Sequence, residues 1–242
     1  MLYGIIADIH SNLEALEAVL SQLRQADRIV CLGDIVGYGP DPNECIEIMQ
    51  KEKIPSVAGN HDKAAIGEFN TQSFNENAKK AIDWTSGQLT ASSRQYLAAL
   101  PQYLATDGLE AVHGSLRDPL DEYVTNIDEA ALSIELMKKN VCFAGHTHVP
   151  LYVGKKAGGG YDGRRLSKDD IVNLNNYSKS FINPGSVGQP RDNDPRASYG
   201  LFDSEKNEFM LLRTEYNIAA VQEKMRIVGL PQFLIGRLVY GQ

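Results

Sequence analysis

The sequence has no apolar run long enough to cross a membrane, few cysteines and no excess of basic residues. No hydrophobic segment approaches the roughly 20 residues of a transmembrane helix, and no basic-then-apolar leader opens the chain. The three cysteines, Cys31, Cys45 and Cys142, are odd in number and far apart, and Cys31 and Cys142 lie inside apolar runs. This usage predicts buried thiols in a reducing cytoplasm rather than disulfides or zinc sites.

The charge balance and composition narrow the class of protein further. The net charge of −7, from 24 basic and 31 acidic residues, argues against extended nucleic acid as a partner. An apolar fraction of 43% and a charged fraction of 23% are typical of globular proteins. We find no repeat and no linker, so we expect one domain over residues 1–242, with insertions near 116–127 and 155–180.

The first third of the chain alternates between strand and helix patterns, which is typical of an α/β fold with parallel strands and crossover helices. Ser11, followed by Glu14, is the expected N-cap of the first helix. The strands and helices that we expect in this region are strands at 2–9, 28–32 and 54–58, and helices at 13–23 and 43–50.

The remaining two thirds is more mixed. Residues 155–179 are Gly-rich, charged and poorly periodic, and we interpret them as a surface loop. The apolar tail at 229–242 either covers the core or makes a contact between copies in a homo-oligomer. The other elements that we expect are helices within 62–100 and at 128–139 and 217–228, strands at 103–106 and 109–113, a hairpin of 141–144 with 151–153, and a hairpin of 197–203 with 208–214.

Chemically active side chains gather where apolar runs end, and all five histidines are among them. They are Asp8, His10, Asp34, Asn60, His61, His113, His146 and His148. Open α/β sheets bind ligands at the carboxyl ends of their strands. Carboxylate, imidazole and amide oxygen without thiolate suit Mn, Fe, Zn or Ni. There are enough ligands for two ions with one bridging carboxylate, an arrangement that can catalyse phosphoryl displacement.

These motifs resemble, in order, those of the calcineurin-like metallophosphoesterases. The matching motifs are Asp8-x-His10, Gly33-Asp34, Gly59-Asn60-His61-Asp62, His113 and Gly145-His146-Thr147-His148. The loops at 37–40 and 183–186 look like those of the small bacterial and archaeal phosphodiesterases. The resemblance implies two mixed β-sheets packed as a sandwich, flanked by α-helices, with a dinuclear metal site on loops at one edge.

The resemblance also implies a role for each site residue. Asp8, His10 and His148 would bind one metal, Asn60, His113 and His146 the other, and Asp34 would bridge them. His61 would contact the substrate phosphate, together with Asn60, and protonate the leaving oxygen.

Three further residues are candidates for the site because of their position in the sequence. Adjacent Asp62 is a candidate catalytic partner that orients His61 and raises its pKa, and it is also a candidate cap of the following helix; the two roles are compatible. Tyr38 and Arg191 are further candidate substrate contacts. The match to G-x-G-x-x-G at 158–163 lacks a strand–turn–helix context and predicts no dinucleotide site.

We therefore expect a hydrolase of small phosphate esters or nucleotide-like substrates that uses a metal-bridging hydroxide and two divalent ions, with Mn²⁺ as the first choice. Phosphodiester hydrolysis is favoured. The alternatives are a phosphomonoesterase, such as a protein phosphatase or a dinucleoside-polyphosphate hydrolase, and a non-catalytic protein-binding scaffold of the same fold.

Overall fold

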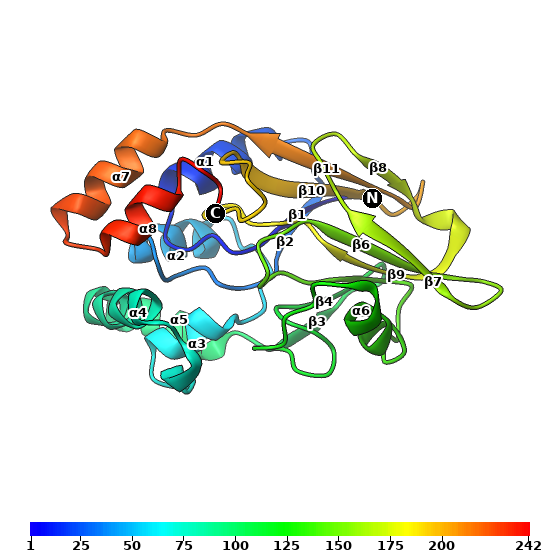
Figure 1. Ribbon diagram of the computed structural model, residues 1–242, viewed down its shortest axis with the longest axis horizontal. Coiled ribbons are helices and arrows are strands. Elements are labelled where there is room, and N and C mark those ends of the chain that lie inside the picture. The colour runs from blue at the N-terminus through cyan, green and yellow to red at the C-terminus, as the bar shows by residue number, and fades with distance from the viewer.

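Two mixed β-sheets packed face to face form the centre of the molecule, as the computed structural model of residues 1–242 shows (Figure 1). The five-stranded sheet has the order β2 (Arg28–Cys31), β1 (Leu2–Ile6), β10 (Ala197–Asp203), β11 (Glu208–Thr214), β8 (Ile171–Asn173). The six-stranded sheet has the order β3 (Tyr103–Ala105), β4 (Glu110–Val112), β5 (Val141–Phe143), β9 (Tyr177–Asn183), β6 (Leu151–Lys156), β7 (Tyr161–Arg165). The expected sandwich of two mixed sheets is confirmed.

Each sheet contains a parallel core that is extended by antiparallel strands. In the five-stranded sheet β1 and β2 are parallel, and in the six-stranded sheet β4, β5 and β9 are parallel. The expected hairpin of β10 and β11 is also present. Because parallel strands share one direction, the segments that follow β1, β2, β4 and β5 can meet at one edge of the sandwich.

The first strand shows why its sequence is apolar at almost every position. Tyr3 and Ile5 pack in the core between the two sheets, whereas Ile6 packs in a second core against α1 (Leu13–Gln22) and α2 (Pro42–Lys51). Successive side chains of a strand point to opposite faces, so a strand covered on both faces needs a continuous apolar run.

Helices cover the outer faces of both sheets. Figure 1 shows α3, α4 and α5 grouped at the lower left and α7 and α8 at the upper left, while α6 packs on the six-stranded sheet. None of the helices has the length and hydrophobicity that crossing a membrane requires. The remaining helices are α3 (Asn60–Ala65), α4 (Glu76–Gln88), α5 (Ala91–Ala99), α6 (Ile127–Ile134), α7 (Ile218–Ile227) and α8 (Gln232–Arg237), with short 3₁₀ turns at Thr71–Ser73 and Leu174–Asn176.

Three local predictions are wrong. The N-cap of α1 is Asn12, whose side chain accepts from the Ala15 N–H, whereas the Ser11 N–H donates to the Ile35 carbonyl at 2.9 Å. Residues 54–58 form only a single bridge, between Cys31 and Ser56, because the segment diverges from β2 toward Pro101. Helix α6 ends at Ile134 rather than at 139, since the buried Glu110 carboxylate binds the backbone N–H groups of Lys138 and Lys139.

The predictions for residues 151–179 also need correction. Strand β6 pairs with β9 and β7, not with β5, because β5 lies between β4 and β9. The expected surface loop contains β7 and β8, which add an edge strand to each sheet. Edge strands are often short and charged, and β7 is exposed along most of its length, so its sequence lacks the alternation that would have identified it.

The apolar tail covers part of the core. Leu230, Leu234, Ile235 and Leu238 are buried in one cluster with residues of α4 and α7. Phe233 and Tyr240, at 60% and 63% exposure, remain on the surface, so a homo-oligomer stays a prediction. The three cysteines are buried and free, as expected.

Replacement of Leu234 by alanine tests this packing. Because Leu234 is only 1% exposed, we expect Leu234→Ala to lower the free energy of unfolding by about 2–5 kcal/mol in urea denaturation. Ile227, which is 75% exposed on α7, supplies the matched control, and Ile227→Ala should change it by no more than about 0.5 kcal/mol. Equal effects of the two variants would contradict the packing role of the tail.

Candidate metal centre

Two buried clusters of possible metal ligands lie at the sandwich edge where the parallel strands end. One contains Asp8, His10 and His148, and the other Asp34, His113 and His146. These residues follow β1, β2, β4 and β5, so two strands from each sheet contribute. Within each cluster the ligand atoms lie within 4.8 Å of one another. The structure thus brings together six residues that the sequence spreads over 141 positions.

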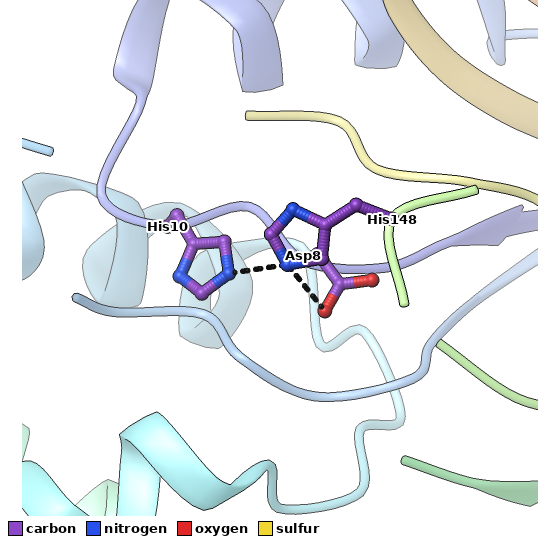
Figure 2. Close-up of side chains that lie close together, drawn as sticks. All are labelled: Asp8, His10 and His148. Atoms are coloured by element: carbon purple, nitrogen blue, oxygen red, sulfur yellow. Dashed lines mark hydrogen bonds and ion pairs between the residues drawn. The ribbon is translucent and has the colours of Figure 1, made fainter. Parts of the chain in front are cut away.

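The donor atoms of the first cluster lie close to one another (Figure 2). The Nε2 atoms of His10 and His148 are 3.0 Å apart, and His148 Nε2 lies 3.5 Å from Asp8 Oδ1. Two nitrogen ligands about 2.1 Å from one ion, at right angles, would lie about 3 Å apart. The spacing therefore fits two imidazoles that share an ion.

The second cluster has the same close spacing of donor atoms, and the side chain of Asn60 lies beside it. His113 Nε2 lies 3.0 Å from His146 Nδ1 and 3.2 Å from Asn60 Oδ1. Asn60 is the first residue of α3 and is 3% exposed. Its amide oxygen adds a neutral oxygen donor to the two imidazoles.

Asp34 lies between the two clusters. Its Oδ2 atom is 3.6 Å from His10 Nε2 and 3.4 Å from His113 Nε2, while Oδ1 accepts the backbone N–H of His61 at 2.9 Å. One carboxylate oxygen therefore faces a donor of each cluster, as a bridging ligand requires.

In each of the four cluster histidines, the ring nitrogen that faces away from the cluster forms a hydrogen bond with a backbone carbonyl. Such contacts fix the tautomer and the orientation of a metal-ligating ring. The contacts are His10 Nδ1 to Val36 O at 3.2 Å, His113 Nδ1 to Leu32 O at 2.9 Å, His146 Nε2 to Asp121 O at 3.2 Å and His148 Nδ1 to Gln189 O at 2.6 Å. Donation from these nitrogens leaves the other nitrogen of each ring as a lone-pair donor toward the cluster.

The backbone at the site is held in an unusual conformation. Five of the cluster residues have positive φ angles: Asp8 (53°), His10 (50°), Asp34 (52°), His146 (68°) and His148 (59°). A non-glycine residue in the left-handed region costs of order 1–3 kcal/mol and persists where the surrounding structure fixes it. These backbone conformations therefore lower the stability of the fold, but they orient the side chains toward the two clusters.

Burial keeps most of the imidazoles neutral. It lowers the pKa of His146 to about 3 and those of His10 and His148 well below the ordinary value. Burial also disfavours charge on His113, but the nearby Asp34 and Asp8 carboxylates outweigh it and raise its pKa to about 9. Burial raises the pKa of Asp8 to about 7. Neutral imidazoles beside carboxylates are the protonation states that a divalent cation needs.

The prediction that Asp62 orients His61 and raises its pKa is wrong. The Asp62 carboxylate accepts the backbone N–H groups of Ile35 at 2.8 Å, Val36 at 3.1 Å and Gly59 at 3.0 Å, so it caps α3 and fixes the loop after Asp34. Burial lowers the pKa of His61 to about 4. The alternative interpretation, a helix cap, accounts for Asp62.

His61 itself lies against the first cluster. Its ring centroid is 4.9 Å from that of His10, 4.4 Å from that of Tyr38 and 4.8 Å from that of Phe74. Its Nδ1 atom is buried and has no hydrogen-bond partner in the protein. A Cβ atom at Gly37 would lie 2.6 Å from this Nδ1 atom, so that edge of the ring packs against the loop that follows Asp34.

Tyr38 and Arg191 also lie at the site, and two unpredicted residues join them. The Arg191 guanidinium carbon is 5.8 Å from the Tyr38 ring centroid, and Tyr38 is 4.6 Å from the His10 ring. Gln189 holds His148, and the ring of Tyr123 lies 3.9 Å from that of His146. In the 155–168 segment, Lys155, Lys156, Arg164 and Lys168 pair with nearby acids.

The chain is similar to several known proteins over nearly its full length. The profile of the calcineurin-like phosphoesterase superfamily domain matches residues 1–207. The uncharacterized protein MJ0912 of Methanocaldococcus jannaschii is 35% identical over 251 residues, which cover 99% of this chain and 98% of that protein.

Two crystal structures share the fold. A metallophosphoesterase from Sphaerobacter thermophilus superimposes with a TM-score of 0.90 at 43% identity and covers 100% of both chains. The hypothetical protein PH1004 from Pyrococcus horikoshii has a TM-score of 0.82 at 20% identity, covering 100% of this chain and 98% of its own, a similarity of fold.

Gly59 offers a test of the site geometry, because a Cβ atom at this position would overlap the Asp34 carboxylate. We expect Gly59→Ala to displace Asp34 and to reduce the bound metal, measured by elemental analysis after reconstitution, below half of the wild-type amount. Gly87, in α4, has no atom within 4 Å of such a Cβ, so Gly87→Ala is the matched control and should keep the full amount. Full metal content in Gly59→Ala would show that Asp34 is not needed between the clusters.

Proposed function

Because the chain belongs to the calcineurin-like phosphoesterase superfamily, a family of metal-dependent phosphoesterases, and keeps both ligand clusters, we propose that it hydrolyses phosphodiesters with two divalent metal ions. The observation that carries this proposal is the position of Asp34, whose Oδ2 atom faces a histidine of each cluster at 3.4 Å and 3.6 Å. A carboxylate placed between two donor sets supports a paired-ion site rather than two separate ones.

The proposed ligands form one set for each ion. Asp8, His10 and His148 would hold one ion and Asn60, His113 and His146 would hold the other, and Asp34 would be shared by both. Nitrogen and oxygen donors without sulfur suit Mn²⁺, Fe, Zn²⁺ or Ni²⁺, and Mn²⁺ is our first choice. When bound, such a pair of ions supplies a nucleophilic hydroxide at neutral pH and positive charge for the phosphoryl oxygens.

The residues around the clusters orient the substrate and stabilise charge. The His61 ring lies 4.9 Å from the His10 ring, so His61 is the proposed contact for a phosphoryl oxygen and for the leaving oxygen. Arg191 adds a permanent positive charge beside Tyr38. In a buried site, charges that are already in place stabilise the negative charge that develops on the phosphoryl group.

A comparison of two substrates tests the reaction class. We expect the Mn²⁺-loaded protein to hydrolyse bis-p-nitrophenyl phosphate with a higher kcat/KM than p-nitrophenyl phosphate. Faster hydrolysis of the monoester would indicate that the protein is a phosphomonoesterase rather than a phosphodiesterase. No turnover with Mn²⁺, Fe²⁺, Zn²⁺ or Ni²⁺ would favour a scaffold of the same fold.

Replacement of His61 tests its role in catalysis. We expect His61→Ala to lower kcat by about 10²–10⁴-fold, the usual contribution of a general acid or base, while the bound metal stays at the wild-type amount. Phe74→Leu removes a ring that packs on His61 but keeps the imidazole, and it controls for loosened packing. A loss of metal in His61→Ala would mean that the residue acts on the clusters instead.

The protonation of His113 predicts how metal binding depends on pH. With a pKa of about 9, His113 is protonated at pH 8 without metal, whereas a metal ligand must be neutral. We expect the apparent affinity to rise roughly tenfold per pH unit up to about pH 9, and more steeply below about pH 7, where Asp8 also loses a proton. Calorimetry at pH 8 in buffers of different ionisation enthalpy should report about one proton released on binding; zero would contradict His113 as a ligand.

A further inference from the structure

Two arginine side chains meet on one amide oxygen next to the metal centre. Arg191 Nη2 donates to Gln189 Oε1 at 3.0 Å, and Arg237 Nη1 donates to the same oxygen at 3.2 Å. Gln189 is 2% exposed, and its backbone carbonyl accepts from His148 Nδ1 at 2.6 Å. A single buried residue therefore fixes both guanidinium groups relative to a cluster histidine.

Neither guanidinium pairs with an aspartate or glutamate side chain. Asp192, the neighbour of Arg191, pairs with Arg213 instead. Arg237 Nε donates to the backbone oxygen of Gln242, and Arg191 Nε is buried without any partner. Elsewhere in the chain, arginines with acidic neighbours form ion pairs, as Arg117, Arg164, Arg196 and Arg226 do.

Two adjacent positive charges repel each other. Burial, and next the charge of Arg191, lower the pKa of Arg237 to about 10. Such an arrangement becomes favourable when an anion binds, and paired guanidinium groups match phosphate geometry well. An anion that bound both guanidinium groups would therefore offset their mutual repulsion.

The two arginines differ in their relation to the metal centre. Arg191 lies over Tyr38, whose ring contacts His10 and His61, so it borders the clusters directly. Arg237 comes from α8, beside α7 in Figure 1, and is linked to the centre by its hydrogen bond to Gln189. Arg237 is therefore placed for a group next to the reacting phosphate rather than for that phosphate itself.

We propose that Arg191 and Arg237 bind a second phosphate group of the substrate, adjacent to the phosphate at the metal centre. This inference rests on the proposed function, and it narrows the substrate class to esters that carry a diphosphate or a second phosphate, as nucleoside diphosphate derivatives do. Arg237 is then a specificity-determining residue contributed by the C-terminal segment.

Binding of two adenosine nucleotides tests the proposal without turnover. We expect the Mn²⁺-loaded protein to bind α,β-methylene-ADP, which resists hydrolysis between its phosphates, more tightly than AMP in calorimetric titrations. Arg237→Gln should weaken binding of the analogue by about tenfold and binding of AMP by no more than about threefold. Arg237→Lys, which keeps the charge, should retain more affinity for the analogue than Arg237→Gln.

The matched control is Arg226→Gln, because Arg226 lies on the neighbouring α7 and pairs with Glu223 at 3.1 Å in an exposed position. It makes the same change in net charge and should alter neither affinity. Equal losses for AMP and the analogue in Arg237→Gln would overturn the proposal, since both arginines would then bind a single phosphate, and so would no loss at all. Absence of hydrolysis by a wild-type protein that keeps this binding preference would refute the proposed function alone.

Discussion

The contact of Asp34 with His10 and His113 is the interaction on which the rest of the site depends. Asp34 and His10 follow strands of the five-stranded sheet, and His113 follows a strand of the six-stranded sheet. One buried carboxylate therefore connects both layers of the sandwich at the edge where ligands collect. Burial disfavours its charge, but the imidazoles of His113 and His61 hold the pKa of Asp34 below its ordinary range, so it stays ionised.

The remainder of the fold holds this carboxylate in place. The Asp62 cap fixes the loop after Asp34, and the His61 backbone N–H fixes its Oδ1 atom. The positive φ angles at the cluster residues are tolerated because the cores on both faces of β1 leave the loops few alternatives. The packed cores on both faces of β1 thus offset the backbone strain at the cluster residues.

Much of this arrangement could be predicted from the sequence. The apolar runs identified most strands, and the placement of all five histidines at strand ends predicted that they would meet. Asp62 was ambiguous because a carboxylate three residues after Gly59 suits a helix cap as well as a histidine partner, and only tertiary contacts decide between them. Gln189, Tyr123 and Arg237 could not be found, since their nearness to the site depends on how loops and the last helix pack. Strands β7 and β8 are hard to predict, because β7 is an exposed edge strand and β8 has only three residues.

The pairing of β1 with β10 has a consequence for how the chain folds. Leu2 lies opposite Asp203, so the central pair of the five-stranded sheet joins segments about two hundred residues apart. Such long-range pairing has a high entropic cost of loop closure, and it therefore slows folding. During synthesis β1 must wait until β10 has left the ribosome, with one edge unpaired in the meantime. We therefore expect the edge that carries the two clusters to form late in folding, and a chain truncated before β10 would lack the partner strand of β1, which leads into Asp8 and His10.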